Sequence, residues 1–257
     1  MDIPLLKPSK ILLLGELCVD KYLFGVADRI SPEAPVPIVK INKWHEREGM
    51  GGNVRNNLVS LGNKVTFIHN DEPIHKTRII DSRYNQQLLR LDREDTPVCK
   101  LKVENLPNFK NFDAIVISDY DKGFLPLHVL AEISDRAYLH NVKLFVDTKK
   151  SYLNGVKGAY IKLNELEYEA LMHEDESNKY IVTLGSKGTK YKNTTYPAEK
   201  VDMLDPTGAG DSFLAAFVSC FLTTDDVGTS IRFANKCAAI SVTKLGCHTI
   251  NPDKIYE

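Results

Sequence analysis

Ala114-Ile115-Val116-Ile117 is the first of several short apolar runs that decide the fold expected for this chain of 257 residues. The runs that follow it are Leu144-Phe145-Val146, Tyr160-Ile161-Lys162-Leu163 and Tyr180-Ile181-Val182-Thr183-Leu184. Each has the length of a buried strand, and the stretches 126–140 and 164–172 between them are predicted helices. Strands that alternate with helices are typical of a mainly parallel sheet covered by helices on both faces. The sequence therefore predicts a three-layer α/β/α domain.

Both ends of the chain extend this pattern. Lys10-Ile11-Leu12-Leu13-Leu14-Gly15 is a solidly apolar run, as expected for a strand buried on both faces. A helix from Asn53 to Leu61 and the strand Val65-Thr66-Phe67-Ile68 follow it. The segment 189–203 suits antiparallel strands, and the chain then enters two long predicted helices, at 210–222 and 226–244.

Two segments fall outside the alternating pattern and predict an edge strand and a hairpin-like flap. Val36-Pro37-Ile38-Val39-Lys40-Ile41 alternates and contains proline, which suits an exposed edge strand. Residues 77–91 contain two short alternating runs and predict a hairpin. We expect residues 1–257 to form a single domain.

Composition excludes several classes of protein. A net charge of -1 gives no electrostatic reason to expect binding to nucleic acid or to a membrane surface. The segment before Lys10 is short and interrupted by Pro4 and Pro8, unlike a signal peptide, and no apolar run is long enough to span a bilayer. The cysteines form no C-x-x-C pair and are expected to be reduced core thiols, so we expect a cytoplasmic protein.

The segment Asp205-Pro206-Thr207-Gly208-Ala209-Gly210-Asp211-Ser212-Phe213 carries the strongest functional signal. It leads into an apolar helical run, so the backbone N–H groups of 208–210 lie at a helix N-terminus and can bind an anion. Asp211 could then accept the proton of a hydroxyl that attacks a phosphorus held by the glycines. The alternative is that Asp211 is an N-cap and that the glycines only make a tight turn.

Polar residues also follow the other predicted strands. In parallel sheets, ligands bind beyond the carboxyl ends of the strands. Each of these residues could instead be a turn or cap residue, but all converge on one edge of the sheet. They lie in the segments Asp20-Lys21-Tyr22, Ser118-Asp119-Tyr120, Asp147-Thr148-Lys149, Asn164-Glu165-Leu166-Glu167 and Gly185-Ser186-Lys187-Gly188.

The motif at 205–213 closely resembles the C-terminal signature of the ribokinase (PfkB-type) sugar kinases, and Gly49-Met50-Gly51-Gly52-Asn53 resembles their first signature. The resemblance implies a ribokinase-like fold with ATP and Mg²⁺ as cofactors. It implies that Asp211 is the catalytic base and that Gly208, Ala209 and Gly210 form the anion hole. The remaining implied roles are sugar binding by Asp20, Gly51, Gly52 and Asn53; nucleotide binding by Asn164, Glu165, Leu166, Glu167, Thr183, Gly185, Ser186, Gly188 and Asn235; magnesium binding near Glu167; and a monovalent cation such as K⁺ at Asp205 and Thr207.

Within that family, three strings look like the kinase domain of the bacterial D-glycero-β-D-manno-heptose-7-phosphate 1-kinases. They are residues 29–39, Asn85-Gln86-Gln87-Leu88-Leu89-Arg90-Leu91-Asp92 and Ser118-Asp119-Tyr120-Asp121-Lys122-Gly123. The resemblance adds Gln87, Asp119 and Asp147 to the expected sugar site. In this family the equivalent strands form a lid that also pairs subunits, which implies lid elements around 22–43 and 77–92 and a homodimer.

The expected activity is transfer of the γ-phosphate of ATP to the anomeric hydroxyl of heptose 7-phosphate, a small-molecule phosphosugar. The acceptor phosphate needs cations, and Arg83, Arg90, Lys122 and Lys149 are the candidates. Two alternatives stay open: a kinase of another phosphosugar, ketose or nucleoside, and a non-catalytic sugar or nucleotide sensor.

Two short connections imply a trimmed scaffold. Only residues 69–76 separate Ile68 from Thr77, where relatives have an additional helix and strand. Between Leu171 and Tyr180 the chain also lacks a helix that relatives carry. Both deletions avoid every residue assigned to the site.

Overall fold

The structure, a computed structural model, describes residues 4–93, 98–244 and 246–255. Its main feature is an 8-stranded sheet with the order β12-β11-β10-β9-β8-β7-β1-β4. The parallel strands are β1 (Lys10–Gly15), β4 (Lys64–Ile68), β7 (Ala114–Asp119), β8 (Lys143–Thr148), β9 (Tyr160–Asn164) and β10 (Lys179–Thr183). Two antiparallel strands, β11 (Thr189–Tyr191) and β12 (Thr194–Tyr196), complete one edge.

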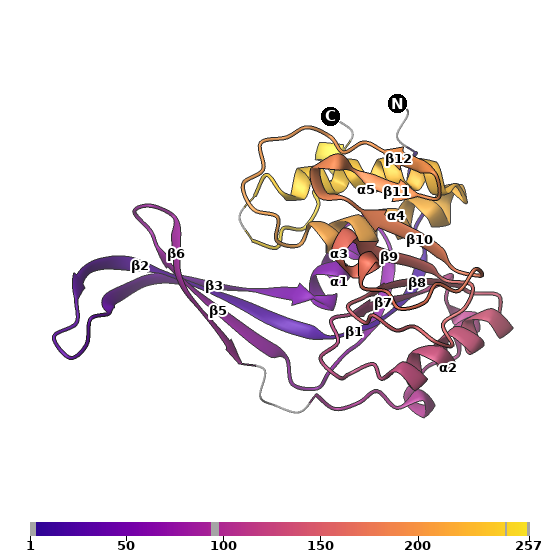
Figure 1. Cartoon of the computed structure of the whole chain (residues 1–257), viewed down its shortest axis with the longest axis horizontal. Coiled ribbons are helices and arrows are strands. Elements are labelled where there is room, and N and C mark those ends of the chain that lie inside the picture. Colours follow the sequence, from indigo (N-terminus) through magenta and orange to yellow (C-terminus); the bar gives the residue numbers. More distant parts are fainter. Residues whose placement is uncertain (1–3, 94–97, 245, 256–257) are drawn as a thin grey trace.

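Helices cover both faces of this sheet (Figure 1). They are α1 (Gly51–Ser60), α2 (Leu127–Leu139), α3 (Glu165–Glu169), α4 (Ala209–Thr224) and α5 (Val227–Ser241), with short 3₁₀ turns at Val103–Asn105, Phe109–Asn111, Gly185–Lys187 and Pro252–Ile255. The predicted three-layer α/β/α architecture is confirmed. The helix predicted at 164–172 is shorter than expected, since α3 ends at Glu169.

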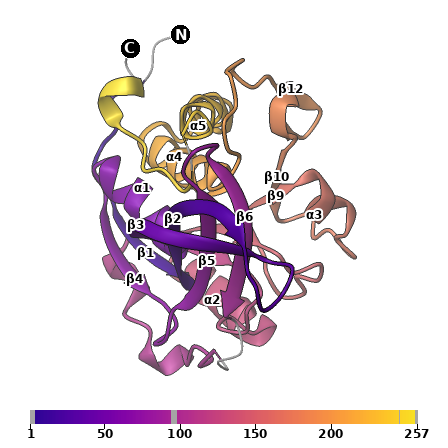
Figure 2. The same cartoon turned by 90° about the vertical axis from the view of Figure 1, so that its left-hand side faces the viewer.

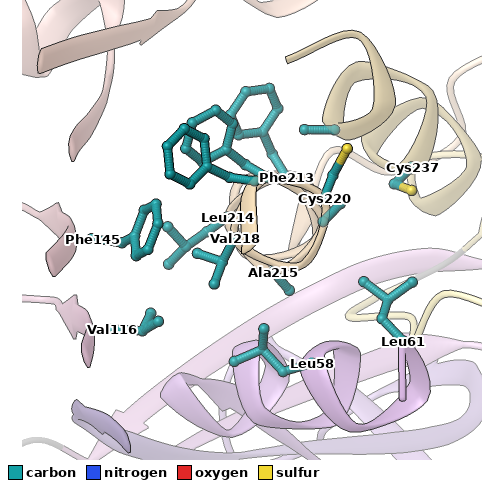
Figure 3. Close-up of a cluster of buried hydrophobic side chains, with 14 of the residues drawn as sticks. Leu58, Leu61, Val116, Phe145, Phe213, Leu214, Ala215, Val218, Cys220 and Cys237 are labelled. Carbon is teal, nitrogen blue, oxygen red and sulfur yellow. The ribbon is translucent and has the colours of Figure 1, made fainter. Parts of the chain in front are cut away.

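The alternating direction of side chains along β1 divides the core into two layers. Ile11 and Leu13 pack into the cluster formed with α1, α4 and α5, whereas Leu12 and Leu14 pack into the cluster under α2. This is why the strand is apolar at every position. Figure 3 shows the first cluster, where side chains of α4 fill the space between α1 and the sheet.

Helix α4 is buried on all sides from Asp211 to Phe221. Phe213, Phe217 and Phe221 stack along one side of it, and Phe145 of β8 meets the last two edge-on. A helix that is apolar all round requires neighbours on every side, which α1, α5 and the sheet provide. The position of its N-terminus, and therefore of Asp211, is set by this packing.

A second, 4-stranded sheet projects from the α/β body (Figures 1 and 2). Its order is β3-β2-β5-β6, formed by β2 (Leu17–Ile30), β3 (Pro37–Met50), β5 (Ile74–Asp81) and β6 (Gln86–Arg93). The predicted edge strand at 36–41 is the start of β3, and the predicted hairpin at 77–91 is β5–β6. We call this structure the small sheet.

The small sheet begins earlier than expected. Glu16 alone separates β1 from β2, so Asp20 lies within a strand and not in a loop after the first strand. Alternate β2 residues from Cys18 to Tyr22 are buried. The charged residues Asp20 and Lys21 interrupt the apolar sequence of β2 and hide this strand from a reading based on apolar runs.

Large apolar side chains lie exposed on the small sheet. Trp44 of β3 has 59% of its surface exposed, and Leu89 and Leu91 of β6 have 50% and 52%. The single tryptophan of the chain therefore lies on this projecting element.

The cysteines are all free. Cys18, Cys220, Cys237 and Cys247 are buried as predicted, but Cys99 is exposed, because it lies in an irregular connection before the first 3₁₀ turn. Among the described residues, no helix is both long and apolar enough to cross a membrane.

Candidate active site

A cavity of about 680 Å³ opens at the carboxyl edge of the main sheet, beside the N-terminus of α4. It brings together many residues that the sequence placed on different strands. Predicted site residues in its lining are Asp147, Lys149, Asn164, Thr183, Gly185, Ser186, Gly188, Gly208, Ala209, Gly210, Asp211 and Asn235. Its volume falls in the range of small-molecule sites.

Asp211 is the central carboxylate of this cavity and is only 4% exposed. Its Oδ1 accepts a hydrogen bond from Tyr120 Oη at 2.6 Å, and its Oδ2 accepts one from Asn53 Nδ2 at 2.9 Å. It is a residue of the first turn of α4, and no side chain caps that helix. The N-cap alternative for Asp211 is therefore wrong.

Burial raises the pKa of Asp211 to about 6, because it disfavours the carboxylate form. The hydrogen bonds from Tyr120 and Asn53 act in the opposite direction. Burial also raises the pKa of Tyr120 well above its ordinary value, with a further contribution from the charge of Asp211. At neutral pH a neutral phenol therefore donates to an ionised carboxylate.

The turn that leads into α4 has a backbone conformation suited to glycine. Gly208 has φ 80°, and a Cβ there would lie 2.7 Å from Asn53 Nδ2. The N–H of Ala209 bonds to the carbonyl of Pro206 at 3.2 Å, so this amide completes a turn in addition to facing the helix terminus. A Cβ on Gly210 would lie 2.9 Å from Lys162 Nζ.

Lys162 is a site residue that was not identified from the sequence. It lies on β9, is 5% exposed and donates to Asp147 Oδ2 at 2.7 Å. Burial acts to lower its pKa, but the charge and hydrogen bond of Asp147 outweigh burial and raise it. The signal was present, since a lysine inside the apolar run 160–163 needs a buried anionic partner.

Glu16 and Arg78, which were not identified from the sequence, contact predicted site residues or their neighbours. Glu16 accepts hydrogen bonds from the backbone N–H groups of Tyr120, at 2.8 Å, and Lys122, at 3.1 Å. Burial and the charge of Asp119 raise the pKa of Glu16. Arg78 of β5 forms an ion pair with Asp20. These contacts join strands that are distant in sequence, so no local pattern indicates them.

Asn164 and Glu167 form a capping box at the start of α3. Asn164 Oδ1 accepts from the N–H of Glu167 at 2.9 Å, and Glu167 Oε2 accepts from the N–H of Asn164 at 2.8 Å. Lys149 contacts the other oxygen of Glu167. The N-x-x-E spacing thus has a structural role in the cap, while Leu166, between them, is 75% exposed.

The far wall of the cavity contains Gly188 and Asn235. A Cβ on Gly188 would lie 2.0 Å from the carbonyl oxygen of Tyr196, so only glycine fits there. Asn235 accepts from Thr189 Oγ1 at 2.7 Å and donates to the carbonyls of Tyr196 and Pro197. Its side chain therefore holds the wall of the cavity in place.

Several predicted residues lie outside the large cavity. Gly51 and Gly52 are required by packing, because a Cβ would meet Phe67 at 2.8 Å in the first case and Glu48 at 2.6 Å in the second. Asp119 is buried and bonded to Thr148 Oγ1 at 2.6 Å. The predicted residues that do not line the cavity are Asp20, Asn53, Asp119, Lys122, Glu165, Leu166, Glu167, Asp205 and Thr207, together with Arg83, Gln87 and Arg90 of the β5–β6 hairpin.

Two of the cations expected to hold an acceptor phosphate are engaged within the small sheet. Arg83 pairs with Asp81 at 2.7 Å and also donates to the carbonyl of Ala27. Arg90 pairs with Asp92 at 2.8 Å.

Asp205, expected to help hold a monovalent cation, forms an Asx turn with Thr207 and accepts a hydrogen bond from the N–H of Gly246 at 2.7 Å.

A helix N-terminus with a buried lysine and a buried carboxylate, at the carboxyl edge of a parallel sheet, is the arrangement of a phosphotransferase. The chain belongs to the pfkB family of carbohydrate kinases, because the model of that family, "pfkB family carbohydrate kinase", matches residues 50–254. This match includes both the glycine segment at α1 and the segment around Asp211.

Curated relatives agree with the family. The bifunctional protein HldE of Campylobacter jejuni is 33% identical over 96% of this chain and 64% of that protein. The HldE of Campylobacter curvus is 31% identical over 98% of this chain and 65% of its own length. The chain thus spans slightly less than two thirds of these relatives. The first alignment covers 293 positions, at least 36 more than the 257 residues of the chain, which agrees with a shortened scaffold.

Solved structures confirm the ribokinase-like fold. Phosphofructokinase-2 from Escherichia coli, in complex with potassium, superposes with a TM-score of 0.76 at 15% identity, covering 96% of this chain and 97% of that chain. Ribokinase from Arabidopsis thaliana, complexed with ribose and ATP, gives a TM-score of 0.69 at 14% identity, covering 97% and 98%.

Proposed function

We propose that this chain is an ATP- and magnesium-dependent kinase that phosphorylates the anomeric hydroxyl of D-glycero-β-D-manno-heptose 7-phosphate. The product would be the 1,7-bisphosphate. One observation carries the proposal. Asp211, whose pKa is raised to about 6 by burial, faces a cavity of about 680 Å³ at the N-terminus of α4. A carboxylate with a pKa near the working pH is suited to general base catalysis.

In the proposed reaction, the O1 hydroxyl of the sugar attacks the γ-phosphorus of ATP in line with the leaving group. The O1–P bond forms, the bond between phosphorus and the β,γ-bridging oxygen breaks, and ADP leaves. Asp211 accepts the proton of O1. Gly208, Ala209 and Gly210 hold the transferred phosphoryl group at the helix N-terminus, and Lys162 beside Gly210 balances its charge.

Asn53 and Tyr120 orient the base. Each donates a hydrogen bond to a different oxygen of Asp211, so the carboxylate cannot rotate freely. Asp20, Gly51, Gly52, Gln87, Asp119 and Asp147 would contact or support the sugar. Lys122 and Lys149 would add positive charge near the reacting groups.

The nucleotide would occupy the side of the cavity formed by Gly185, Ser186, Gly188 and Asn235. Ala238, Ala239 and Val242 of the α5 region supply apolar surface there for a base. The ribose and ATP named for the ribokinase from Arabidopsis thaliana support a nucleotide in this fold.

The described residues contain no cluster of three or more His, Cys, Asp or Glu side chains able to hold a metal. In kinases Mg²⁺ binds mainly to phosphate oxygens and water, with few protein ligands. Glu167 and Asn164, at the edge of the cavity, are the residues that would help hold it. When bound, the ion would shield the charge of the phosphates. Asp205 and Thr207 would hold K⁺.

The choice of heptose 7-phosphate as acceptor rests on the strings at 29–39, 85–92 and 118–123, together with the similarity to HldE. We also propose a cytoplasmic location, one domain over 1–257, and a homodimer in which the small sheet serves as lid and subunit contact. The exposure of the apolar side chains Trp44, Leu89 and Leu91 supports a subunit contact at the small sheet.

ADP formation should be measured with heptose 7-phosphate, heptose, fructose 6-phosphate and ribose, for the wild type and for Asp211→Asn. We expect heptose 7-phosphate to be preferred. Asp211→Asn should lower kcat by at least about 100-fold and leave both KM values within a few-fold. Preference for another sugar would overturn the assignment of heptose 7-phosphate as acceptor but not the kinase function. Nucleotide binding without turnover of any sugar would favour a non-catalytic sensor.

A further inference from the structure

A second cavity, of about 400 Å³, lies next to the proposed catalytic base. Its lining includes Asn53, whose Nδ2 donates to Asp211 Oδ2 at 2.9 Å. It also includes Cys247, whose Cα would lie 3.3 Å from a Cβ on Gly208. The second cavity therefore adjoins both the base and the glycine turn. A sugar with one hydroxyl at Asp211 would place its other end here by passing Asn53, which separates the base from this cavity.

Two guanidinium groups line the second cavity. Arg47 of β3 donates to the carbonyl of Cys247 at 2.8 Å, and Arg55 of α1 contacts Glu48 Oε2 at 2.5 Å. Arginine presents several N–H donors in a planar fork, which suits the oxygens of a phosphate. Arg47 precedes the glycine segment 49–52 on β3, and Arg55 follows it on α1. The positions of both side chains therefore depend on the backbone of this segment.

The carboxylates in the same lining are matched by cations. Glu46 pairs with Lys21 at 3.2 Å, and Glu48 pairs with Arg55. The pKa of His248 reflects the positive charges near this cavity. Burial lowers this pKa, and the charges of Arg47, Lys244 and Lys254 lower it further. Positive charges from β3 and from the C-terminal segments therefore act on this cavity.

We infer that this second cavity binds the distal phosphate of the acceptor sugar through Arg47 and Arg55. The inference rests on the proposed function and gives it a specificity site. Glu48 occupies, on Arg55, a position that a phosphate oxygen would take, so the phosphate would compete with this carboxylate. Arg83 and Arg90 belong to the β5–β6 hairpin and do not line this cavity.

The test compares Arg47→Gln, Arg55→Gln and Glu48→Gln in the full chain. Matched controls are Arg136→Gln and Glu132→Gln on α2, which form an equivalent ion pair at 2.6 Å and pack on the other face of the sheet. Steady-state kinetics are measured with heptose 7-phosphate and with unphosphorylated heptose, and inorganic phosphate is added as a competitor.

Each arginine variant should raise KM for heptose 7-phosphate by about 10- to 100-fold, with kcat and KM for ATP unchanged. Turnover of unphosphorylated heptose should be unchanged. Glu48→Gln should act in the opposite direction and lower KM for heptose 7-phosphate, because it removes the competing carboxylate. A general loss of folding cannot produce opposite signs. Inorganic phosphate should compete with the sugar in the wild type and much more weakly in Arg55→Gln.

If Arg47→Gln and Arg55→Gln behave like Arg136→Gln toward heptose 7-phosphate, the phosphate site is overturned while the kinase function stands. If no sugar is turned over, calorimetric binding of heptose 7-phosphate decides the question separately. Binding that weakens in Arg55→Gln supports the second cavity even though the kinase function fails, and binding that is unchanged overturns it.

Discussion

Asp211 lies among groups that act on its proton in opposite directions. Burial favours the protonated form, while hydrogen bonds from Tyr120 and Asn53 favour the carboxylate, and the result is a pKa of about 6. If these donors were absent, burial would raise the pKa further, and less of the base would be ionised at neutral pH. Tyr120 and Asn53 are therefore positioning residues that keep the base available.

Tyr120→Phe removes one of the two donors to Asp211, so we expect the pKa of the carboxyl to rise. Because a general base must be ionised, activity is lost as the pH falls through this pKa. The acid limb of the kcat profile should therefore move from near pH 6 to higher pH. Profiles from pH 5 to 9 measure the shift, with Tyr138→Phe, at an exposed position of α2, as control. An unmoved limb would show that Tyr120 does not act on the base.

The same carboxyl makes stability depend on pH. Its folded pKa, about 6, exceeds the ordinary value of 3.8, so the folded state holds the proton more tightly than the unfolded state. Stability from this group is complete below about pH 4 and is lost as the pH rises through about 6. Relative to Asp211→Asn, the wild type should lose on the order of 2 kcal/mol between pH 4.5 and 8. Urea unfolding of both proteins at pH 4.5 and 8 measures the difference, and equal pH dependence would contradict the raised pKa.

At the scale of elements, the turn before α4 combines two glycines with different requirements. Gly208 has φ 80° and lies close to Asn53, so Gly208→Ala should destabilise folding by about 1 kcal/mol or more. Gly210 lies within the helix, where alanine is favourable, but its Cβ would press on Lys162 Nζ, the end of a flexible side chain.

Gly210→Ala should therefore keep or raise the melting temperature while kcat falls by about tenfold or more, because Lys162 is displaced from the transferred phosphoryl group. Thermal melting and kcat of the two glycine variants form a matched pair. If kcat is unchanged in a folded Gly210→Ala variant, Lys162 has no role in the transfer.

Local patterns predicted most of these elements. The apolar run at 10–15 and those after residue 114 fixed the strands of the main sheet, because burial on both faces requires apolar side chains at every position. Strand β2 was not recognised as a whole, because it carries charged residues such as Asp20 and Arg29. Its partners, β3 and β5, supply the pairing that makes it a strand.

The candidate site, like the fold, could be predicted from the sequence only in part. Gly208 to Asp211 form a continuous motif, so the sequence shows it directly. Tyr120 follows β7 and Lys162 lies on β9, and they meet Asp211 and Gly210 only in the folded chain. The cap formed by Asn164 and Glu167 shows that one motif can carry both a structural and a proposed functional role.

At the scale of the whole molecule, the small sheet projects from the α/β body and exposes apolar side chains (Figure 1). Leu89 and Leu91 lie on its edge strand β6 and Trp44 on the opposite edge strand β3. Exposed apolar groups on a sheet with two open edges are the usual features of an association surface.

Leu89→Asp should therefore weaken the proposed homodimer by at least about tenfold, because an unpaired carboxylate would be buried at the contact. Sedimentation at several protein concentrations measures the association. Leu139→Asp, at an exposed position of α2, is the control and should behave as the wild type. A wild type that sediments as a monomer at all concentrations would rule out the dimer.

Trp44 also provides a fluorescence probe of the small sheet. As the single tryptophan of the chain, it makes the fluorescence excited at wavelengths that tyrosine does not absorb a signal from the small sheet alone. Its indole is 59% exposed and lies under the Lys21 ammonium at 4.9 Å, so the emission should be red-shifted in the isolated chain. Coverage of the ring by a second subunit would shift the emission to shorter wavelength, and iodide would quench it less. A stopped-flow trace of this emission would time the association of the small sheet without any added dye.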